Sequence, residues 1–385
     1  MNRPVAVSRH DKRAMKILYC IPTLEHGGAE RQLSYIAAAL AAGGHEVHVA
    51  SSRGGPNLAR MESAGVKWHR LGGAGNRDPV IFYRLLRLMR RLRPDVVQTI
   101  LTPMDILGGA AALLTRTRWV LRESSSAPLY TAGWRNRLRL SLGRRADAVV
   151  SNSAGGDAYW RSAPGAQALR VIPNAIPFDE IARADSARAG GFGPAEKVVL
   201  YAGRMDAGKN VESLIAALAR VAGEMPFVAV MCGDGPRRPH LERMARSLGV
   251  AHRIVFKGYV DNLWDLMKRA DVLVSLSRVE GCPNVVLEAM ACGCPLVVSD
   301  IPAHREMLDE QTARFADPDD TSKAAEDIKA ILSYGDAARA HAARASAAGR
   351  PVETTARRYE QLYLSLLGEA CDSHRGAQVS DSEAA

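Results

Sequence analysis

Short, continuous apolar runs alternate along this chain with stretches that have helical spacing. In the first half, the apolar runs lie at residues 16–22, 46–50, 66–71, 95–99, 119–123 and 148–153. Such runs are typical of strands that are buried on both faces of a parallel sheet. A helix that ends at Gly43-Gly44 separates the first two runs, because glycine supplies the positive φ with which many helices terminate. This order of strand, loop, helix and strand predicts a doubly wound α/β sheet.

A second unit of the same kind follows a change in composition. Residues 171–196 are rich in Pro, Ala, Gly and Asp and predict a linker. New apolar runs then lie at residues 197–203, 228–236, 254–258, 270–277 and 296–299. A chain of 385 residues is long for one core, so two domains are expected. Because ligands bind beyond the carboxyl ends of such strands, we expect two Rossmann-like domains that face each other across a cleft.

The domain boundaries follow from these patterns. We place the first domain at residues 15–178 and the second at 196–352, and predict a final amphipathic helix at about 353–370. The terminal segments 1–14 and 371–385 are polar and predict disorder. The start lacks the apolar region of a signal peptide, and no apolar run reaches the length of a membrane span. Six cysteines without metal-ligand spacing favour reduced thiols in the cytoplasm and predict no metal site.

The net charge of +10 requires a partner or a structural reason. Nucleic acid is disfavoured, because only 5% of the residues are aromatic and no basic stacking platform is present. The arginines collect instead in segments 84–93 and 134–145, which have the pattern of cationic amphipathic helices. Such helices suit peripheral docking on anionic lipid headgroups. The alternative is that both pack on the sheet and expose their arginines to solvent.

The densest chemistry lies between residues 280 and 299. The apolar run 270–277 leads into a loop, and helical spacing begins after Pro283-Asn284, with Asn284 as the expected N-cap. Gly293 and Pro295 end the helix before the next strand. The free N–H groups of a first helical turn bind phosphate, and Gly281 allows a ligand to approach the backbone closely.

Charged residues on this edge of the second sheet specify the ligand further. Glu280 and Glu288 would repel a diphosphate, so we expect them to accept hydrogen bonds from the hydroxyls of a sugar and a ribose. Arg204 and Lys209 follow the first strand of the second domain, and two such cations bind a diphosphate and stabilise its charge as it departs. Together these residues indicate a nucleotide-sugar. The alternative is that all four are solvated surface charges.

The first domain offers a second group of residues at the strand ends. The loop at Gly27-Gly28 is not a GxGxxG motif, so a nicotinamide cofactor is weakly supported, and the loop could cup a transferred group or an acceptor. Polar residues follow three further strands and could line the same mouth on the acceptor side: Asp105, Arg122, Glu123 and Asn152.

These motifs together resemble the GT-B retaining glycosyltransferases of family 4, also described as glycosyl transferases group 1. The matching residues are the run from Gly27 to Arg31, Ile172-Pro173-Asn174, Gly203-Arg204 with Lys209, the run from Gly233 to Pro236, and Glu280 with Glu288 followed by Ala289-Met290-Ala291, Gly293 and Pro295. The likeness covers about residues 15–370. It implies a GT-B fold whose last helix returns to the first domain, so that domain closure assembles the site.

The resemblance also implies roles for individual residues. Arg204 and Lys209 would hold the donor diphosphate, and Glu280 would contact the donor sugar near the reacting centre. Glu288 would bind the ribose, and the backbone at Tyr259-Val260 would contact the base. Gly27-Gly28 would border the donor phosphate and the acceptor. The distal phosphate would be capped by the backbone of Gly281, Cys282, Pro283, Asn284 and Val285. No metal and no other cofactor would be needed.

One departure from the family concerns the catalytic base. Many relatives carry a histidine after the strand that here ends in Arg122-Glu123-Ser124, and this chain has none there. Arg122 or Glu123 could take part of that role. Alternatively no side-chain base is needed, because in a front-face attack the departing phosphate itself accepts the proton of the acceptor.

The sequence therefore predicts a retaining glycosyltransferase, an enzyme that moves a hexose from a nucleotide-sugar, often a UDP-sugar in similar proteins. The expected acceptors are polyprenyl-linked, lipid or polysaccharide molecules of cell-surface glycan synthesis, at the inner face of the membrane. Two other classes stay open, namely a nucleotide-sugar epimerase of similar fold and a non-catalytic protein that binds nucleotide-sugars.

Overall fold

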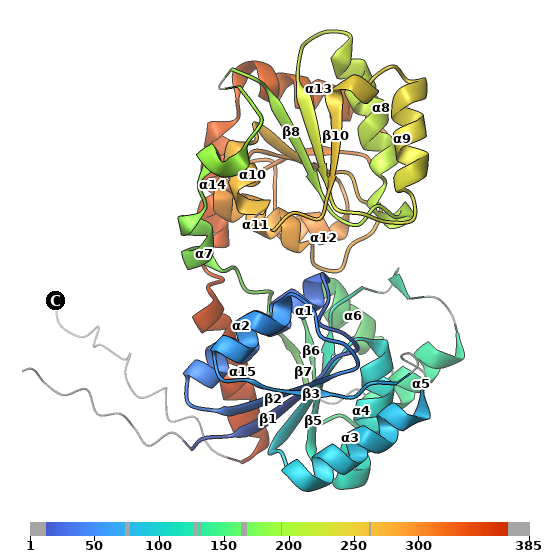
Figure 1. The fold of residues 1–385 in the computed structure, drawn as a ribbon, viewed down its shortest axis with the longest axis vertical. Coiled ribbons are helices and arrows are strands. Elements are labelled where there is room, and N and C mark those ends of the chain that lie inside the picture. Colours follow the sequence, from blue (N-terminus) through green and yellow to red (C-terminus); the bar gives the residue numbers. More distant parts are fainter. Residues whose placement is uncertain are drawn as a thin grey trace, which may run out of the picture.

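The computed structural model describes residues 13–73, 78–126, 129–130, 133–162, 168–193, 195–261 and 263–368. They form two α/β domains, one above the other in Figure 1. Both sheets are parallel, and both domains have helices on the two faces of the sheet. The predicted fold class, two Rossmann-like domains, is therefore confirmed. The expected tails lie outside the described residues, apart from residues 13 and 14.

The first sheet has seven strands in the order β3-β2-β1-β4-β5-β6-β7. The strands are β1 Lys16–Cys20, β2 Glu46–Ser51, β3 Lys67–Arg70, β4 Val96–Ile100, β5 Arg118–Glu123, β6 Ala148–Ser151 and β7 Ala168–Val171. Its helices are α1 Gly28–Ala42, α2 Asn57–Ser63, α3 Pro79–Leu92, α4 Thr102–Thr115, α5 Trp134–Gly143 and α6 Ala154–Arg161. The edge strand β7 is not among the predicted strands, because the expected linker begins at its last residue.

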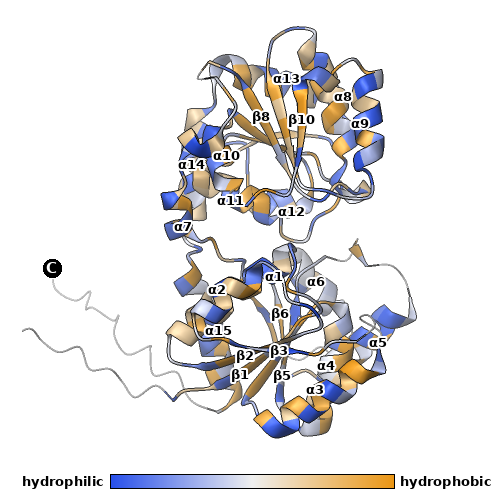
Figure 2. Ribbon diagram, in the orientation of Figure 1, coloured by the Kyte–Doolittle hydropathy of each residue, from blue (hydrophilic) through white to orange (hydrophobic). Residues whose placement is uncertain are grey.

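Strand β1 shows how one apolar run supplies both faces of this sheet. Ile17 and Tyr19 pack with α1, α2 and the last helix of the chain. Leu18 and Cys20, which alternate with them, pack on the opposite face with α3, α4 and the ring of Trp119. Because successive side chains of a strand point to opposite faces, a central strand between two helical layers must be apolar throughout. Figure 2 shows this arrangement, with hydrophobic strands inside and hydrophilic helix surfaces outside.

The second sheet has six strands in the order β10-β9-β8-β11-β12-β13. They are β8 Val198–Ala202, β9 Val228–Cys232, β10 Ile254–Gly258, β11 Val272–Ser275, β12 Leu296–Ser299 and β13 Arg314–Ala316. Helices α8 Val211–Ala222, α9 Arg238–Ser247 and α13 Thr321–Tyr334 contribute to the core on one face. The core on the other face takes in α7 Phe178–Arg183, α10 Leu263–Arg269, α11 Asn284–Cys292 and α14 Ala337–Ala347. Short helices lie at η2 Ser186–Ala189, η3 Ala207–Lys209, η4 Ala251–Arg253 and α12 Pro302–Arg305.

Two segments of the chain pass side by side between the domains. The segment after β7 meets the one before α15 Val352–Leu366 at an isolated parallel bridge between Ile176 and Pro351. Helix α15 then packs on the first sheet, where the phenol of Tyr363 donates a 2.6 Å hydrogen bond to Gln98. The expected linker is partly helical, because it contains α7 and η2. No helix in the described part of the chain is long and apolar enough to cross a membrane.

Candidate functional site

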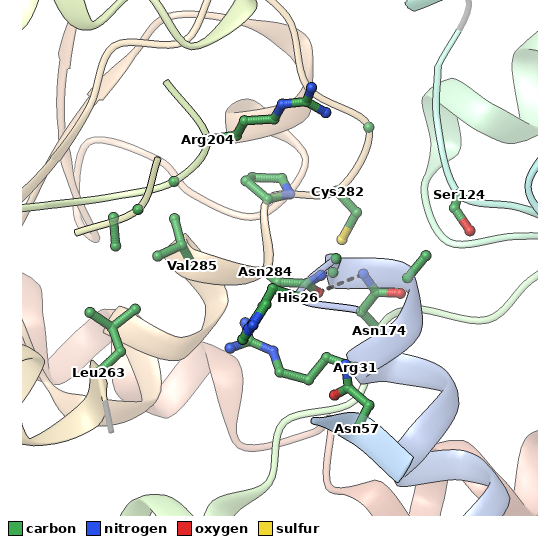
Figure 3. Close-up of a pocket in the computed structure, with 18 of the residues that line it drawn as sticks. His26, Arg31, Asn57, Ser124, Asn174, Arg204, Leu263, Cys282, Asn284 and Val285 are labelled. Atoms are coloured by element: carbon green, nitrogen blue, oxygen red, sulfur yellow. Dashed lines mark hydrogen bonds between the residues drawn. The ribbon is translucent and has the colours of Figure 1, made fainter. Parts of the chain in front are cut away.

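A cavity of about 780 Å³ opens between the two domains, and residues from the carboxyl ends of both sheets line it. From the first domain these include the loop at Gly27-Gly28 after β1. From the second domain they include Arg204 after β8 and the segment from Glu280 to Val285 after β11. Figure 3 shows part of this wall, with Arg204 and Cys282 from the second domain and Ser124 and Asn174 from the first. The strand-end rule thus places the cavity where ligands bind in open α/β sheets.

Helix α11 points its first turn at this cavity. Asn284 is its first residue rather than the N-cap, which is Pro283, so the predicted N-cap was wrong. The Asn284 side-chain oxygen instead accepts hydrogen bonds across the domain boundary, from Asn174 at 2.8 Å (Figure 3) and Gln32 at 3.3 Å. The helix ends at Gly293, whose φ of 72° requires a residue that tolerates the left-handed region, as expected. The nine-residue helix therefore offers a positive N-terminal end to a bound anion.

The opposing loop explains why residue 281 is a glycine. A Cβ atom at Gly281 would lie 2.8 Å from the carbonyl oxygen of Ser124 and from the Cα of Ser125. The neighbouring Ser126 hydroxyl donates a 2.8 Å hydrogen bond to the carbonyl of Glu280. The glycine was expected to admit a ligand, but here it admits the backbone that follows β5. The two domains are thus in direct contact beside the start of α11.

Lys209 and Glu280 form an ion pair on the cavity wall. The ammonium lies 2.5 Å from Glu280 Oε1, and the Ser277 hydroxyl donates to the same oxygen at 2.7 Å. Asp206 accepts from the backbone N–H groups of Gly208 and Lys209, which fixes the short helix η3 that carries the lysine. Only 10% of the Glu280 side chain is exposed. Its carboxylate is therefore held in one orientation by two donors.

Arg204 stands beside this pair with far more freedom. Its side chain is 69% exposed, and its guanidinium lies 3.7 Å from Asp206. Its backbone carbonyl accepts a 3.1 Å hydrogen bond from the phenol of Tyr201, which anchors the loop. The structure therefore brings Arg204, Lys209 and Glu280 together on one wall, with the guanidinium of Arg204 accessible to an incoming anion.

Glu288 lies behind this wall rather than on it. It is 2% exposed, and its two oxygens accept from Arg31 of α1 and, at 3.1 Å, from the indole of Trp264. Burial raises the pKa of Glu288, while Arg31 opposes the shift. Each carboxylate oxygen has a second acceptor site, so a ribose hydroxyl could still bond to it once Arg31 yields space. The expected ribose role stays a prediction, and Arg31 is a partner that the sequence did not indicate.

An aromatic pair closes one end of the cavity. His26 of the first domain stacks on Tyr259 of the second, with ring centroids 4.7 Å apart and an angle of 20° between the planes. Val260 and Leu263 line the cavity next to them. Tyr259 is still 59% exposed, so its ring is accessible beside the stack. The predicted base-contacting segment therefore lies at the boundary between the domains.

The four acceptor-side candidates separate into two pairs. Arg122 and Asn152 line the cavity as expected. Asp105 and Glu123 are fully buried instead and form an ion network with Arg139, at 2.7 Å and 2.8 Å. The expectation that these two acids line the mouth was therefore wrong.

The physical reason lies in the alternation of β5. Arg122 and Glu123 are neighbours on one strand and must point to opposite faces, so only one of them can reach the cavity. Glu123 also accepts hydrogen bonds from Tyr130, Trp160 and the backbone of Ser125. Burial raises the pKa of Asp105 to about 6, and Arg139 opposes the shift. These acids thus hold α5 to the sheet.

The comparisons with known proteins agree with this arrangement. A family model described as Glycosyltransferase Family 4 matches residues 26–180, and one described as Glycosyl transferases group 1 matches residues 196–334. The chain is a family 4 glycosyltransferase with the GT-B fold. Membership of this enzyme family sets aside the epimerase and the non-catalytic binding protein.

Several relatives of this glycosyltransferase have described activities. An α-1,4-N-acetyl-D-galactosaminyltransferase of Campylobacter jejuni, named for an acceptor linked to undecaprenol through a diphosphate, is 28% identical over 291 residues, which is 72% of this chain and 77% of that one. The lipopolysaccharide core glycosyltransferase LpsE of Rhizobium meliloti is 32% identical over 191 residues, 46% of this chain and about half (53%) of LpsE. The structure of HepE from Anabaena with UDP and glucose superposes with a TM-score of 0.81 at 22% identity, over 91% of this chain and 100% of that one.

Pattern reasoning missed several residues of the glycosyltransferase site. His26, Arg31 and Trp264 all line the cavity, and two of them contact the opposite domain. Arg31 had a weak signal, because it lies in the first turn of the helix that begins at Gly28. The partner of each residue is distant in sequence, and helical spacing carries no information about it.

Proposed function

We propose that the glycosyltransferase moves a sugar from a UDP-sugar, with retention of the anomeric configuration, to a lipid-linked or polysaccharide acceptor of cell-surface glycan synthesis. One observation carries the proposal: Arg204 and the Lys209–Glu280 pair stand on one wall of the interdomain cavity, which the start of α11 also lines. Two cations and a helix N-terminus favour a diphosphate. The relatives support the substrate classes, through UDP in the HepE structure and a diphospho-undecaprenol acceptor in the C. jejuni enzyme.

The polar groups divide the work of such a transfer. Lys209 and Arg204 stabilise the charge that develops on the departing diphosphate. Glu280 is held by Lys209 and Ser277, so its remaining acceptor sites can orient a hydroxyl of the donor sugar. On the acceptor side, Asn152 has a buried side-chain oxygen and Ser124 a buried hydroxyl without partners among the described residues. Both line the cavity and suit the hydroxyls of an acceptor sugar.

The retaining course agrees with the position of Glu123. This acid is the nearest candidate for a base at the end of β5, but four donors enclose it away from the cavity. A front-face attack needs no such base, because the departing phosphate oxygen takes the proton from the acceptor hydroxyl as the new glycosidic bond forms and the bond to the phosphate breaks. The same cations that stabilise the leaving group make a resident metal unnecessary, so we expect activity to persist in excess EDTA.

We further propose that helices α3 and α5 dock the enzyme on anionic membranes. Both pack around α4 on one face of the first domain. Tyr83 of α3 and Trp134 of α5 are 64% and 65% exposed, and both helices also carry exposed arginines. Aromatic rings and arginines on one surface suit a headgroup layer. Arg139 points inward, so α5 contributes its outer arginines, such as Arg135 and Arg137.

The experiment incubates purified enzyme with a panel of UDP-, GDP- and dTDP-sugars, with and without a lipid-diphosphate acceptor that carries a sugar. We expect one UDP-sugar to give a glycosylated product, whose anomeric configuration by NMR equals that of the donor. Inversion would reject the retaining course, and transfer from a GDP-sugar alone would reject the choice of base. The matched control, Glu242→Gln on the outer helix α9, should leave turnover unchanged, whereas Glu280→Gln should abolish it.

A further inference from the structure

Arg122 is a buried cation that forms no ion pair with any residue that the structure describes. The residue is 3% exposed at the carboxyl end of β5, and its side chain lines the cavity between the domains. A guanidinium stays protonated at every physiological pH, so burial cannot be relieved by loss of the proton. An unpaired buried charge is strongly unfavourable unless something compensates it. A group near Arg122, or a bound anion, must therefore compensate its charge.

The side chains that Arg122 contacts most directly are neutral. One terminal nitrogen donates a 2.9 Å hydrogen bond to the side-chain oxygen of Asn174, and the Nε atom has no partner among the described residues. The phenol of Tyr359 is also close enough to Arg122 for the guanidinium to oppose the rise in its pKa that burial causes. None of these groups carries a negative charge.

The nearby acids are all committed elsewhere. Glu123 bonds to Arg139 on the other face of the strand, and Glu280 pairs with Lys209. Glu306 accepts a 2.6 Å hydrogen bond from the backbone of Ala154. No carboxylate in the described part of the chain forms an ion pair with Arg122. The cavity itself is the remaining place from which a negative charge can come.

Arg122 stands close to the loop that leads into α11. Two residues further along, the carbonyl of Ser124 packs against Gly281, and Ser126 bonds to Glu280. Burial raises the pKa of the Cys282 thiol to about 12, and the charges that act on this thiol include Arg350, Glu306 and Arg122. The guanidinium therefore lies across the domain boundary from the loop proposed to cap the distal phosphate.

We infer that Arg122 is an anion-binding residue that completes the phosphate site from the first domain. Arg204 and Lys209 contribute positive charge from the second domain, and Arg122 lines the same cavity from the first. The anion is a phosphate group, which either the donor diphosphate or a diphosphate-linked acceptor can supply. The charge of Arg122 acts on the Cys282 thiol, and Ser124, two residues along, packs against Gly281, which favours the donor. This donor assignment rests on the proposed UDP-sugar function.

An anion site shared in this way couples binding to domain closure. A diphosphate held only by Arg204 and Lys209 leaves Arg122 uncompensated, whereas closure places all three cations around it. The Nε donor of Arg122 has no partner among the described residues, and a planar guanidinium can offer two donors to a phosphate, which an ammonium group cannot match in geometry. In this proposal the first domain therefore contacts the phosphate of the ligand as well as the acceptor.

The test compares ligands with and without phosphate on the full-length protein. Calorimetry measures the binding of UDP, and competition measures that of uridine, for the wild type, Arg122→Gln, Arg122→Lys and the control Arg246→Gln. Arg246 is exposed on α9, so the control removes the same charge far from the cavity. We expect Arg122→Gln to lower the affinity for UDP about 10- to 100-fold, which is the range of a charge-assisted contact, and to leave the affinity for uridine unchanged. Arg122→Lys should recover part of the loss.

The outcomes separate the role, the source of the anion and the proposed function. The anion site is overturned if the affinities for UDP and for uridine fall equally. It is also overturned if neither affinity falls and the KM for a diphosphate-linked acceptor is unchanged. Unchanged UDP affinity with a raised KM for that acceptor, but not for the same sugar without diphosphate, assigns the anion to the acceptor. Should the wild type bind inorganic pyrophosphate in an Arg122-dependent way yet no UDP, the anion site stands and the UDP-sugar function fails.

Discussion

The ion pair between Arg31 and Glu288 offers a test of how the domains are held together. Arg31 belongs to α1 of the first domain and Glu288 to α11 of the second. The Glu288 side chain is 3% exposed, and that of Arg31 is 32% exposed. Arg31→Ala would leave the buried carboxylate with one side-chain hydrogen-bond donor among the described residues, the indole of Trp264. The cost should therefore be that of an uncompensated buried charge.

The magnitude follows from burial. Removal of one partner of a buried ion pair costs about 3–5 kcal/mol, and partial solvation of the site through the space that Arg31 vacates reduces this to about 2–3 kcal/mol. Each kcal/mol shifts the melting temperature of a domain of this size by about 2–4 °C, so we expect a fall of about 4–12 °C. The control is Arg53→Ala, whose side chain is 67% exposed and whose partner Glu25 is 50% exposed. A pair with such access to water is worth only about 0–1 kcal/mol.

The pH dependence provides a second readout. Burial already raises the pKa of Glu288, and loss of the opposing Arg31 raises it further. An acid whose pKa is higher in the folded state stabilises that state at low pH, and this contribution is lost as the pH rises through the folded pKa. Arg31→Ala should therefore be less destabilised near pH 5 than near pH 8 in denaturant titrations. Equal losses for Arg31→Ala and Arg53→Ala, without pH dependence, would refute the reasoning.

Three further predictions concern the reaction and its location. Glu280→Gln should abolish turnover in the donor assay while calorimetry still detects UDP, and retained turnover would remove Glu280 from the reacting centre. Lys209→Ala should lower the affinity for UDP about 10- to 100-fold. Arg204→Ala should lower it somewhat less, because the exposed side chain of Arg204 must be ordered when the ligand binds. Unchanged affinities in calorimetry would argue against the diphosphate site. Flotation with phosphatidylglycerol vesicles should decrease with salt and with Arg135→Gln plus Arg137→Gln, and salt-independent flotation would contradict the α3–α5 surface.

Much of the fold could be predicted because central parallel strands must be apolar on both faces. The runs at β1 and β8 therefore stand out from the helices that follow them. The edge strands β7 and β13 could not be recognised from the sequence, because they are short and only partly buried, as Arg170 and Arg314 illustrate. Loop chemistry likewise indicated the site around Glu280, since glycine, acid and helix start occur together within a few residues.

The contacts across the domain boundary could not be predicted in the same way. Arg31 and Glu288 are hydrogen-bonded although they are 257 positions apart in the sequence, and Asn174 and Asn284 are 110 positions apart. The strand-end rule places a residue at an edge, but it does not say which face the side chain takes. For that reason Arg122 reached the cavity while its neighbour Glu123 turned to Arg139. To predict such contacts, one must know which face of the sheet each side chain points to, as well as where the strand ends.

The first domain contacts each part of the proposed donor site. His26 stacks on Tyr259 near the base-contacting segment, Arg31 holds the ribose candidate Glu288, and Ser126 bonds to the backbone of Glu280. A donor that enters the cavity must exchange some of these contacts for its own, most directly at Glu288, where Arg31 occupies one oxygen. We therefore expect the cost of breaking these contacts to reduce the free energy of donor binding and to couple it to the position of the first domain, which is proposed to hold the acceptor. In this proposal, donor occupancy and domain closure form one equilibrium rather than two.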